Sequence, residues 1–250
     1  MPIQKTKGFV LRREDVRETS LLLTFYTEDF GKLKLISKGV RSPEQKFISA
    51  YELFALDDII FYERRKKGFF LLSECVLLNF FPKTRSSLDR LSFAVYFIEL
   101  LDFITPVGEK NAEMYDLLLN SLELLSSNAS PKRVARIFEI KMLSILGLMP
   151  RLSSCANCDK KVSGPRIRFS FSSGGLLCES CLRFDKKARP ILLGTINFIS
   201  HIEQLPFDKL KHIKVSMRVG GEVEKLLRDF IDYHLDVKLK SVSFISKINR

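Results

Sequence analysis

The first 80 residues have hydrophobic positions spaced as in short β-strands. The clearest case is 32–37, where Leu33 and Leu35 alternate with Lys32 and Lys34, as in a strand with one buried and one exposed face. Similar segments lie at 7–12, 20–26, 52–63 and 68–77. Five short strands in this stretch predict a small closed barrel, and the OB-fold is the common five-stranded form.

After Pro82 the spacing of hydrophobic residues becomes helical. Residues 88–104 are apolar on nearly every face, which predicts a central buried helix that ends before Pro106 and Gly108. Further helices are predicted at 112–125, 131–146, 196–204 and 215–235. Their apolar stripes are expected to pack in a core. No element is predicted for the tail, 241–250, which is a candidate mobile segment.

Residues 151–190 lack helical spacing and contain two CxxC pairs, Cys155 with Cys158 and Cys178 with Cys181, separated by 19 residues. This spacing is typical of a zinc ribbon, in which four thiolates bind one Zn²⁺ tetrahedrally. Since four thiolates leave no open coordination position, we expect one structural zinc per chain and no catalysis by it. The sequence thus predicts an α+β chain: an OB-fold at 1–81, then a helical domain at 82–250 with a zinc-ribbon-like insertion at 151–190.

Two other uses of the cysteines compete with zinc binding. Disulfides are rare in the reducing cytoplasm, and a redox CxxC would be single and near a βαβ unit. The fifth cysteine, Cys75, lies in an apolar strand, where a buried inert thiol is the default.

Composition adds a partner class to this picture. The chain has 41 basic and 29 acidic side chains, a net charge of +12, which favours a polyanion such as nucleic acid or an anionic membrane surface. A basic soluble protein without such a partner is the alternative. No apolar run is long enough to span a membrane, and the first residues lack the apolar stretch of a secretion signal, so we expect a cytoplasmic protein.

The motifs of several enzyme classes are absent from the sequence. There is no GxxxxGK[ST] loop for nucleotide phosphates, no HxE with PCxxC as in zinc deaminases, and no acidic cluster typical of a two-metal nuclease. The three histidines, His201, His212 and His234, belong to no recognisable catalytic motif. We therefore predict no catalytic residues and no enzymatic activity.

Single-stranded nucleic acid is bound by basic grooves with aromatic side chains. The candidate contacts in the barrel are two groups, one around 32–46 and one in the turn at 64–67, although the turn could equally be solvated. The cysteine-containing segment adds Arg166 and Arg168, which alternate with Ile167, Phe169 and Phe171. The full set of DNA-binding candidates is Lys32, Lys34, Lys38, Arg41, Arg64, Arg65, Lys66, Lys67, Arg166 and Arg168.

The order of these parts resembles the RecO family of bacterial recombination mediators. The matching stretches are Gly8-Phe9-Val10-Leu11, residues 17–24 (RETSLLLT), Phe30-Gly31-Lys32-Leu33, Lys38-Gly39-Val40-Arg41, Gly147-Leu148-Met149-Pro150 and Gly174-Gly175-Leu176-Leu177-Cys178. The resemblance covers residues 1 to about 235, and all four cysteines are present although some members of the family lack them.

The resemblance implies a DNA repair and recombination protein that binds single- and double-stranded DNA and anneals complementary strands. It also implies action with RecR to load RecA onto DNA coated by the single-strand-binding protein, whose C-terminal tail would dock on the helical domain. It implies a bacterial protein associated with the nucleoid. The alternatives are a zinc-ribbon interaction module of transcription or replication that touches nucleic acid incidentally, and a metal-dependent hydrolase.

One expectation comes from charge alone. Residues 150–190 have nine basic and three acidic side chains, half of the net charge of the chain. We expect this segment to be part of the DNA surface. Alternatively, the excess positive charge offsets the formal −2 of a zinc ion with four thiolates.

Overall fold

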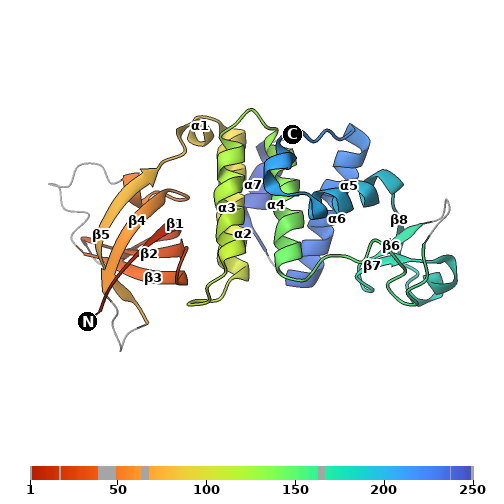
Figure 1. The fold of residues 1–250 in the computed structure, drawn as a ribbon, viewed down its shortest axis with the longest axis horizontal. Helices are drawn as coiled ribbons and strands as arrows, with labels where there is room; N and C mark the ends of the chain where they lie inside the picture. Colours follow the sequence, from red (N-terminus) through yellow and green to blue (C-terminus); the bar gives the residue numbers. More distant parts are fainter. Residues whose placement is uncertain are drawn as a thin grey trace. The chain divides into compact units, whose positions relative to one another are not determined.

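The computed structural model describes residues 2–16, 18–38, 49–62, 68–162, 167–236 and 238–248. The chain packs as two compact units (Figure 1): Met1–Pro131 with Leu239–Arg250, and Lys132–Lys238. Packing therefore groups the first helices and the end of the chain with the barrel.

The N-terminal unit contains the predicted five-stranded barrel. Its strands are β1 (Ile3–Val16), β2 (Ser20–Thr27), β3 (Gly31–Ser37), β4 (Leu56–Tyr62) and β5 (Phe70–Asn79), closed in the order β1-β2-β3-β5-β4. Every neighbouring pair is antiparallel except β3 and β5, which are parallel. The short 3-10 helix η1 (Ser49–Tyr51) precedes β4. The OB-fold prediction is confirmed.

Alternating side chains fill the inside of this barrel, as the strand periodicity predicts. The buried cluster consists of Val10, Leu21, Leu23, Phe25, Leu33, Leu35, Tyr51, Ile59, Phe61 and Leu72. Phe30 and Phe70 pack against it, and each contacts the Phe61 ring edge-on with centroids 5.4 Å apart. Phe30, Tyr51 and Phe70 therefore belong to the core of the barrel.

Among the residues that the structure describes, β3 and β5 pair at two positions, Leu35 with Phe70 and Ile36 with Leu71. The beginning of β3 therefore has a free edge, and exposed strand edges invite pairing with other chains. Here the loop after α2 covers the edge, because the Gly108 N–H donates to the Lys32 carbonyl at 2.8 Å. Gly31 makes this approach possible: a Cβ there would lie 1.9 Å from the Glu109 carbonyl oxygen.

Helices α1 (Pro82–Arg85), α2 (Leu88–Ile104) and α3 (Ala112–Leu125) follow the barrel in the same unit. The bounds predicted for α2 and α3 agree with the structure, because Pro and Gly residues and the Asn111 cap mark their ends clearly. α2 contacts β1, α1 and α3. This placement explains why its apolar residues are not confined to one face.

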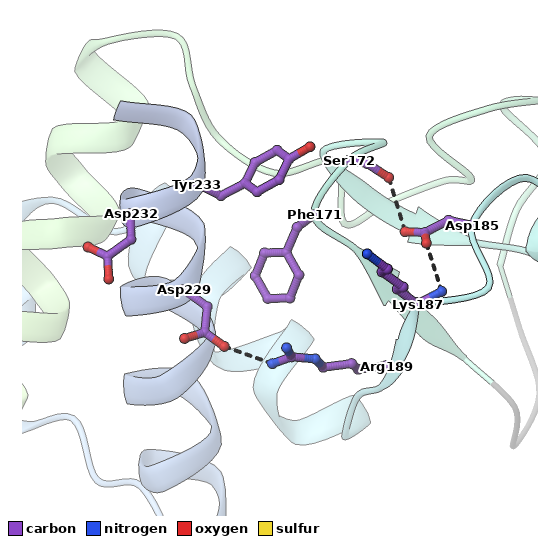
Figure 2. A pocket seen from close by; sticks show the side chains of 8 residues that line it. All are labelled: Phe171, Ser172, Asp185, Lys187, Arg189, Asp229, Asp232 and Tyr233. Atoms are coloured by element: carbon purple, nitrogen blue, oxygen red, sulfur yellow. Dashed lines mark hydrogen bonds and ion pairs between the residues drawn. The ribbon is translucent and has the colours of Figure 1, made fainter. Parts of the chain in front are cut away.

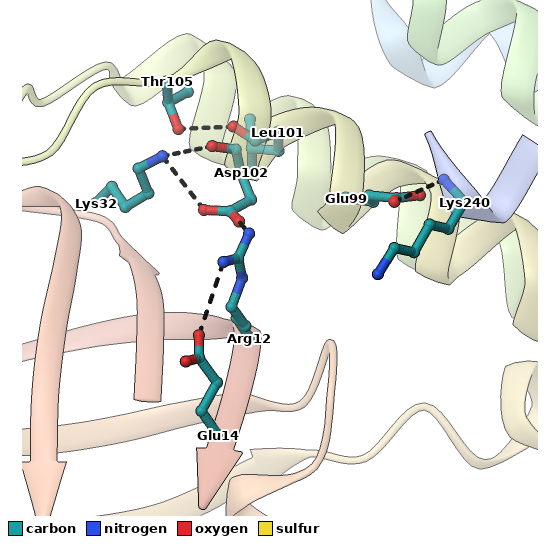
Figure 3. A network of polar contacts seen from close by, with 8 residues as sticks. All are labelled: Arg12, Glu14, Lys32, Glu99, Leu101, Asp102, Thr105 and Lys240. Carbon is teal, nitrogen blue, oxygen red and sulfur yellow. Dashed lines mark hydrogen bonds and ion pairs between the residues drawn. The ribbon is translucent and has the colours of Figure 1, made fainter. Parts of the chain in front are cut away.

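The expectation of a mobile tail is wrong for most of the tail. Lys240–Ile248 form α7, which packs on α2. Its first turn is held by Glu99 of α2, whose carboxylate accepts hydrogen bonds from the N–H groups of Lys240 (2.8 Å) and Ser241 (2.9 Å) (Figure 3). Prediction missed this helix because its capping group comes from another helix, far away in the sequence.

The second unit contains α4 (Pro131–Ile145), α5 (Leu193–Gln204), the 3-10 helix η3 (Phe207–His212) and α6 (Met217–Leu235). Between α4 and α5 lies a small sheet in the order β7-β6-β8, made of β7 (Gly175–Leu177), β6 (Arg168–Ser170) and β8 (Arg189–Pro190). Phe169 of β6 is buried and contacts Phe230 of α6 at 6.0 Å between centroids. None of the described helices is both long and apolar enough to span a lipid bilayer.

Candidate metal centre and nucleic-acid interface

The four cysteines of the two CxxC pairs converge at one point of the second unit. The sulfur atoms of Cys155, Cys158, Cys178 and Cys181 all lie within 4.8 Å of one another, and the Cys158 and Cys178 sulfurs are 3.6 Å apart. A tetrahedral zinc ion with bonds of about 2.3 Å would separate its sulfurs by about 3.8 Å. The cluster therefore has the size and donor set that a metal ion requires.

Two tight turns bring the sulfurs together. In the first, the Cys155 N–H donates to the Lys160 carbonyl (2.9 Å) and the Asp159 N–H donates to the Cys155 carbonyl (3.0 Å), with Asp159 in the left-handed region at φ 57°. In the second, the Cys181 N–H donates to the Cys178 carbonyl (2.9 Å) at the start of the 3-10 helix η2 (Glu179–Phe184). The two buried cysteines, Cys155 and Cys181, pack with Leu177 and Ala188.

Hydrogen-bond donors reach the Cys155 and Cys181 sulfurs, and those at Cys155 favour its thiolate form. The Cys178 N–H donates to the Cys155 sulfur, and the Asn157 side chain donates to the Cys181 sulfur, both at 3.4 Å. Burial raises the pKa of the Cys155 thiol, but backbone donors including those of Cys178 and Asn157 outweigh it and lower the pKa to about 6. Since metals bind the thiolate, the protein environment fits the ligand role.

None of the five cysteines forms a disulfide. Cys75 lies on β5 in the other unit, half-buried against the barrel core, and its thiol donates to the Ala50 carbonyl at 3.8 Å. Burial raises the pKa of this thiol. An uncharged, packed thiol is the expected state of Cys75.

The predicted basic residues do not form one group in the structure. Lys34 and Lys38 are exposed on β3 and just after it, with no ion-pair partner among the described residues. Arg168 is half-buried, and its guanidinium donates to the Ala188 carbonyl at 3.0 Å. The other candidates, Arg41, Arg64, Arg65, Lys66, Lys67 and Arg166, lie outside the described residues.

Lys32 is placed differently from its predicted position on an exposed face. Its side chain is 10% exposed, because α2 covers this end of the outer barrel surface. The ammonium donates to the backbone carbonyl of Asp102 and, at 3.2 Å, to its carboxylate. Asp102 also accepts from Arg12 of β1 at 2.6 Å (Figure 3). One α2 carboxylate thus neutralises a cation from each of two strands, and Lys32 is not presented to solvent.

The start of α3 covers more of the β2–β3 surface, which OB-folds commonly use for ligands. Tyr26 of β2 is fully buried, and its hydroxyl donates to the Asn111 carbonyl at 3.4 Å. Further along, Lys34 on β3 and Lys38 just after it stay exposed. Sequence reasoning missed the role of Asp102, yet a signal exists: Asp102 and Glu99 are the only acidic residues in the apolar stretch from 91 to 104, and each contacts another element.

Comparison with known proteins agrees with this architecture. The family model described as Recombination protein O N terminal matches residues 1–81, and that described as Recombination protein O C terminal matches residues 85–243. The boundary between the two matches lies just after the end of the barrel at β5.

Relatives named DNA repair protein RecO match nearly the whole chain. The one from Syntrophus aciditrophicus is 33% identical over 250 residues, covering 98% of this chain and 96% of the relative. Those from Desulforamulus reducens and Pelotomaculum thermopropionicum are each 31% identical, covering 99% and 100% of this chain and 96% of each relative. With both family models matched over the barrel and the helical region, the chain belongs to the RecO family of DNA repair proteins.

Proposed function

We propose that this protein is a non-enzymatic mediator of DNA strand pairing. It binds single- and double-stranded DNA, anneals complementary strands and, with RecR, helps load RecA onto DNA coated by the single-strand-binding protein. The observation that carries the proposal is a closed OB barrel with exposed, unpaired lysines in a chain of a DNA repair family. The net charge of +12 supports a polyanionic partner.

The mechanism is electrostatic. Two DNA strands repel one another through their phosphates, and a protein that neutralises phosphates on both strands lowers this repulsion. On the barrel, Lys34 and Lys38 are the described residues we assign to phosphate contact, together with Arg41 and the turn at 64–67, outside the described residues. Lys32 is left out, because Asp102 already neutralises its ammonium.

We propose one structural zinc ion per chain, held by Cys155, Cys158, Cys178 and Cys181. The distances among the sulfurs and the donors around them support this assignment. When bound, the metal crosslinks the two turns, and four thiolates leave it no position for a substrate. The contact between the Phe169 and Phe230 rings would hold the β7-β6-β8 sheet on α6.

Membership of the RecO family supports a set of proposed partners. We propose that RecR and the acidic C-terminal tail of the single-strand-binding protein bind this chain, the tail on the helical region, and that RecA is reached indirectly. The site of action is the nucleoid in the bacterial cytoplasm. Titration calorimetry with the tail peptide at low salt tests the tail contact, which an absence of heat would refute.

The direct test of the function is annealing of complementary oligonucleotides, followed by fluorescence quenching without any nucleotide present. We expect the protein to accelerate annealing several-fold over the spontaneous rate, with no change when ATP is added. A matched pair of variants localises the effect. Lys34→Gln with Lys38→Gln should slow annealing, whereas Lys110→Gln should not, because Lys110 is exposed but already paired with Asp29.

No acceleration by the wild-type protein would favour the alternative of a zinc-ribbon interaction module. Cleavage of the strands on addition of magnesium would instead indicate a nuclease, which contradicts the non-enzymatic proposal.

A further inference from the structure

The second unit contains a pocket between its small sheet and α6 that the barrel-based function does not use (Figure 2). The pocket has a volume of about 570 Å³ and is open to solvent, a size typical of small-molecule sites. Two aromatic rings line it, Phe171 just after β6 and Tyr233 on α6. Tyr233 is 58% exposed, so a large apolar ring is available there for contact.

The walls of this pocket are held rigidly. The Phe171 ring contacts Phe169 edge-on at 5.1 Å, and the Arg189 guanidinium lies 5.4 Å from the Phe171 centroid. Arg189 is in turn fixed by Asp229 of α6 at 2.8 Å. A rigid aromatic wall loses little conformational entropy when a ligand binds.

A basic rim adjoins the aromatic wall. Lys186 and Lys187 are exposed and occupy a turn in which the Asp185 carboxylate accepts from the Lys187 N–H (2.8 Å), Ser170 (2.6 Å) and Ser172 (3.0 Å). Neither lysine ammonium has an ion-pair partner in the part of the chain that the structure describes. The turn therefore presents two cations from a fixed backbone, while its carboxylate is occupied with hydrogen bonds.

The charged residues of the pocket come from two sides. Lys187 and Asp185 line it from the sheet side, and Lys186 is the exposed neighbour of Lys187 in the same turn. Asp229 and Asp232 line it from α6. A phosphate deep in the pocket would be repelled by these carboxylates, but an uncharged nucleobase would not, and its N–H groups can donate to them. The arrangement suits a nucleotide whose phosphate remains at the lysines and whose base enters the pocket.

We propose that this pocket binds one nucleotide of single-stranded DNA, with the base stacked on Tyr233 beside Phe171 and the phosphate at Lys186 and Lys187. The inference deepens the proposed function and rests on it. A base inside a duplex is stacked and paired, so the pocket selects single strands. The cysteine-containing segment would thereby add specificity for single strands to a chain whose barrel binds phosphates.

This proposal assigns the phosphate contacts of the segment to other residues than the sequence suggested. Arg168 is half-buried and donates to the Ala188 carbonyl, so it is a poor candidate. Lys186 and Lys187 are exposed and are the better candidates. Aromatic stacking contributes about 1–3 kcal/mol per base. Losing the Tyr233 ring should therefore raise the dissociation constant for single strands about 5- to 150-fold.

The chain contains no tryptophan, so Tyr233→Trp provides a unique fluorophore at the pocket. We expect a single-stranded oligonucleotide to quench its fluorescence strongly, and an abasic oligonucleotide of equal length to leave it nearly unchanged. Phe244→Trp, at an exposed position on α7, is the control and should not be quenched. Equal quenching by the two oligonucleotides, or none by either, would overturn the proposal.

Affinity measurements complete the test. Tyr233→Ala should weaken single-strand binding but not duplex binding, and Tyr233→Phe should retain wild-type affinity, with zinc content unchanged in both. Lys187→Gln should lower the salt slope for single strands by about 0.7. If wild-type protein binds DNA but Tyr233→Ala binds single strands within two-fold of wild type, the pocket assignment is refuted and the proposed function stands. If wild-type protein binds no DNA, both are refuted.

Discussion

The carboxylate of Asp102 connects α2 to two strands of the barrel, and its replacement by asparagine measures what this connection contributes to stability. Asp102 is 13% exposed and Lys32 is 10% exposed, with 3.2 Å between carboxylate and ammonium. Removing one partner of a buried ion pair costs about 3–5 kcal/mol, because it leaves the other charge unpaired. The Lys32 ammonium keeps the backbone carbonyl of residue 102, so we expect the lower end, about 3 kcal/mol.

The other partner of Asp102 should matter much less. The Arg12 side chain is 60% exposed, and exposed ion pairs contribute up to about 1 kcal/mol. We therefore expect Arg12→Gln to lower the free energy of unfolding by less than about 1 kcal/mol. Replacing both buried charges, as in Lys32→Met with Asp102→Asn, should recover most of the loss, because the unpaired ammonium is gone.

Urea unfolding followed by near-ultraviolet circular dichroism of tyrosine suits this comparison. Five of the six tyrosines lie in the N-terminal unit and only Tyr233 lies in the other, so the signal mainly reports the unit that contains Asp102. With a slope of about 1–3 kcal/mol per molar urea, a loss of about 3 kcal/mol lowers the midpoint by roughly 1 M or more. A loss below about 1 kcal/mol for Asp102→Asn, or no recovery in the double variant, would refute the reasoning.

The remaining predictions concern the metal, a buried acid and the α7 cap. Elemental analysis of protein purified without added metal should give close to one zinc per chain, and a chelator should unfold the cysteine-containing segment. Less than about a tenth of a zinc per chain, in protein with an intact fold, would exclude a structural metal. Asp57 is fully buried in the barrel, and burial raises its pKa to about 8 despite the Cys75 thiol and Arg85 nearby. The folded state therefore keeps a proton on Asp57 that the unfolded chain loses near pH 4. The free energy of unfolding consequently falls as the pH rises from about 4 to 8. Asp57→Asn should stabilise the protein by an amount that grows by up to about 1.4 kcal/mol per pH unit in that window. Urea midpoints at pH 5 and pH 8 measure this, with Asp58→Asn as the control; an equal gain at both pH values would contradict it. Glu99→Gln should increase hydrogen exchange of the first α7 amides by weakening the charge-assisted bonds to Lys240 and Ser241, and unchanged exchange would show that packing alone holds the helix.

Local patterns in the sequence were sufficient for most of the fold. The alternation around Leu33 and Leu35 placed the barrel strands, and the turn residues around α2 and α3 placed those helices, because both signals depend on neighbours along the chain. The two CxxC pairs predicted the converging sulfurs for the same reason: each pair is one short turn.

Features that depend on distant residues were not predictable in this way. Periodicity placed Lys32 on an outer face, but only the packing of α2 on the barrel shows that this face is covered there. α7 depends on Glu99, about 140 positions earlier in the chain. The pocket combines Phe171 with Tyr233 from separate elements, and no spacing along the sequence relates the two.

The central claim, that this RecO-family chain binds DNA strands through its basic surfaces, is tested most directly by the affinity for a single-stranded oligonucleotide measured by fluorescence anisotropy across a salt series. We expect tight binding at low salt, with the logarithm of the affinity falling linearly against the logarithm of salt concentration. Lys34→Gln with Lys38→Gln should lower that slope by about 1.4, whereas Lys110→Gln should leave it unchanged. No binding at low salt, or binding whose affinity does not depend on salt, would contradict the claim.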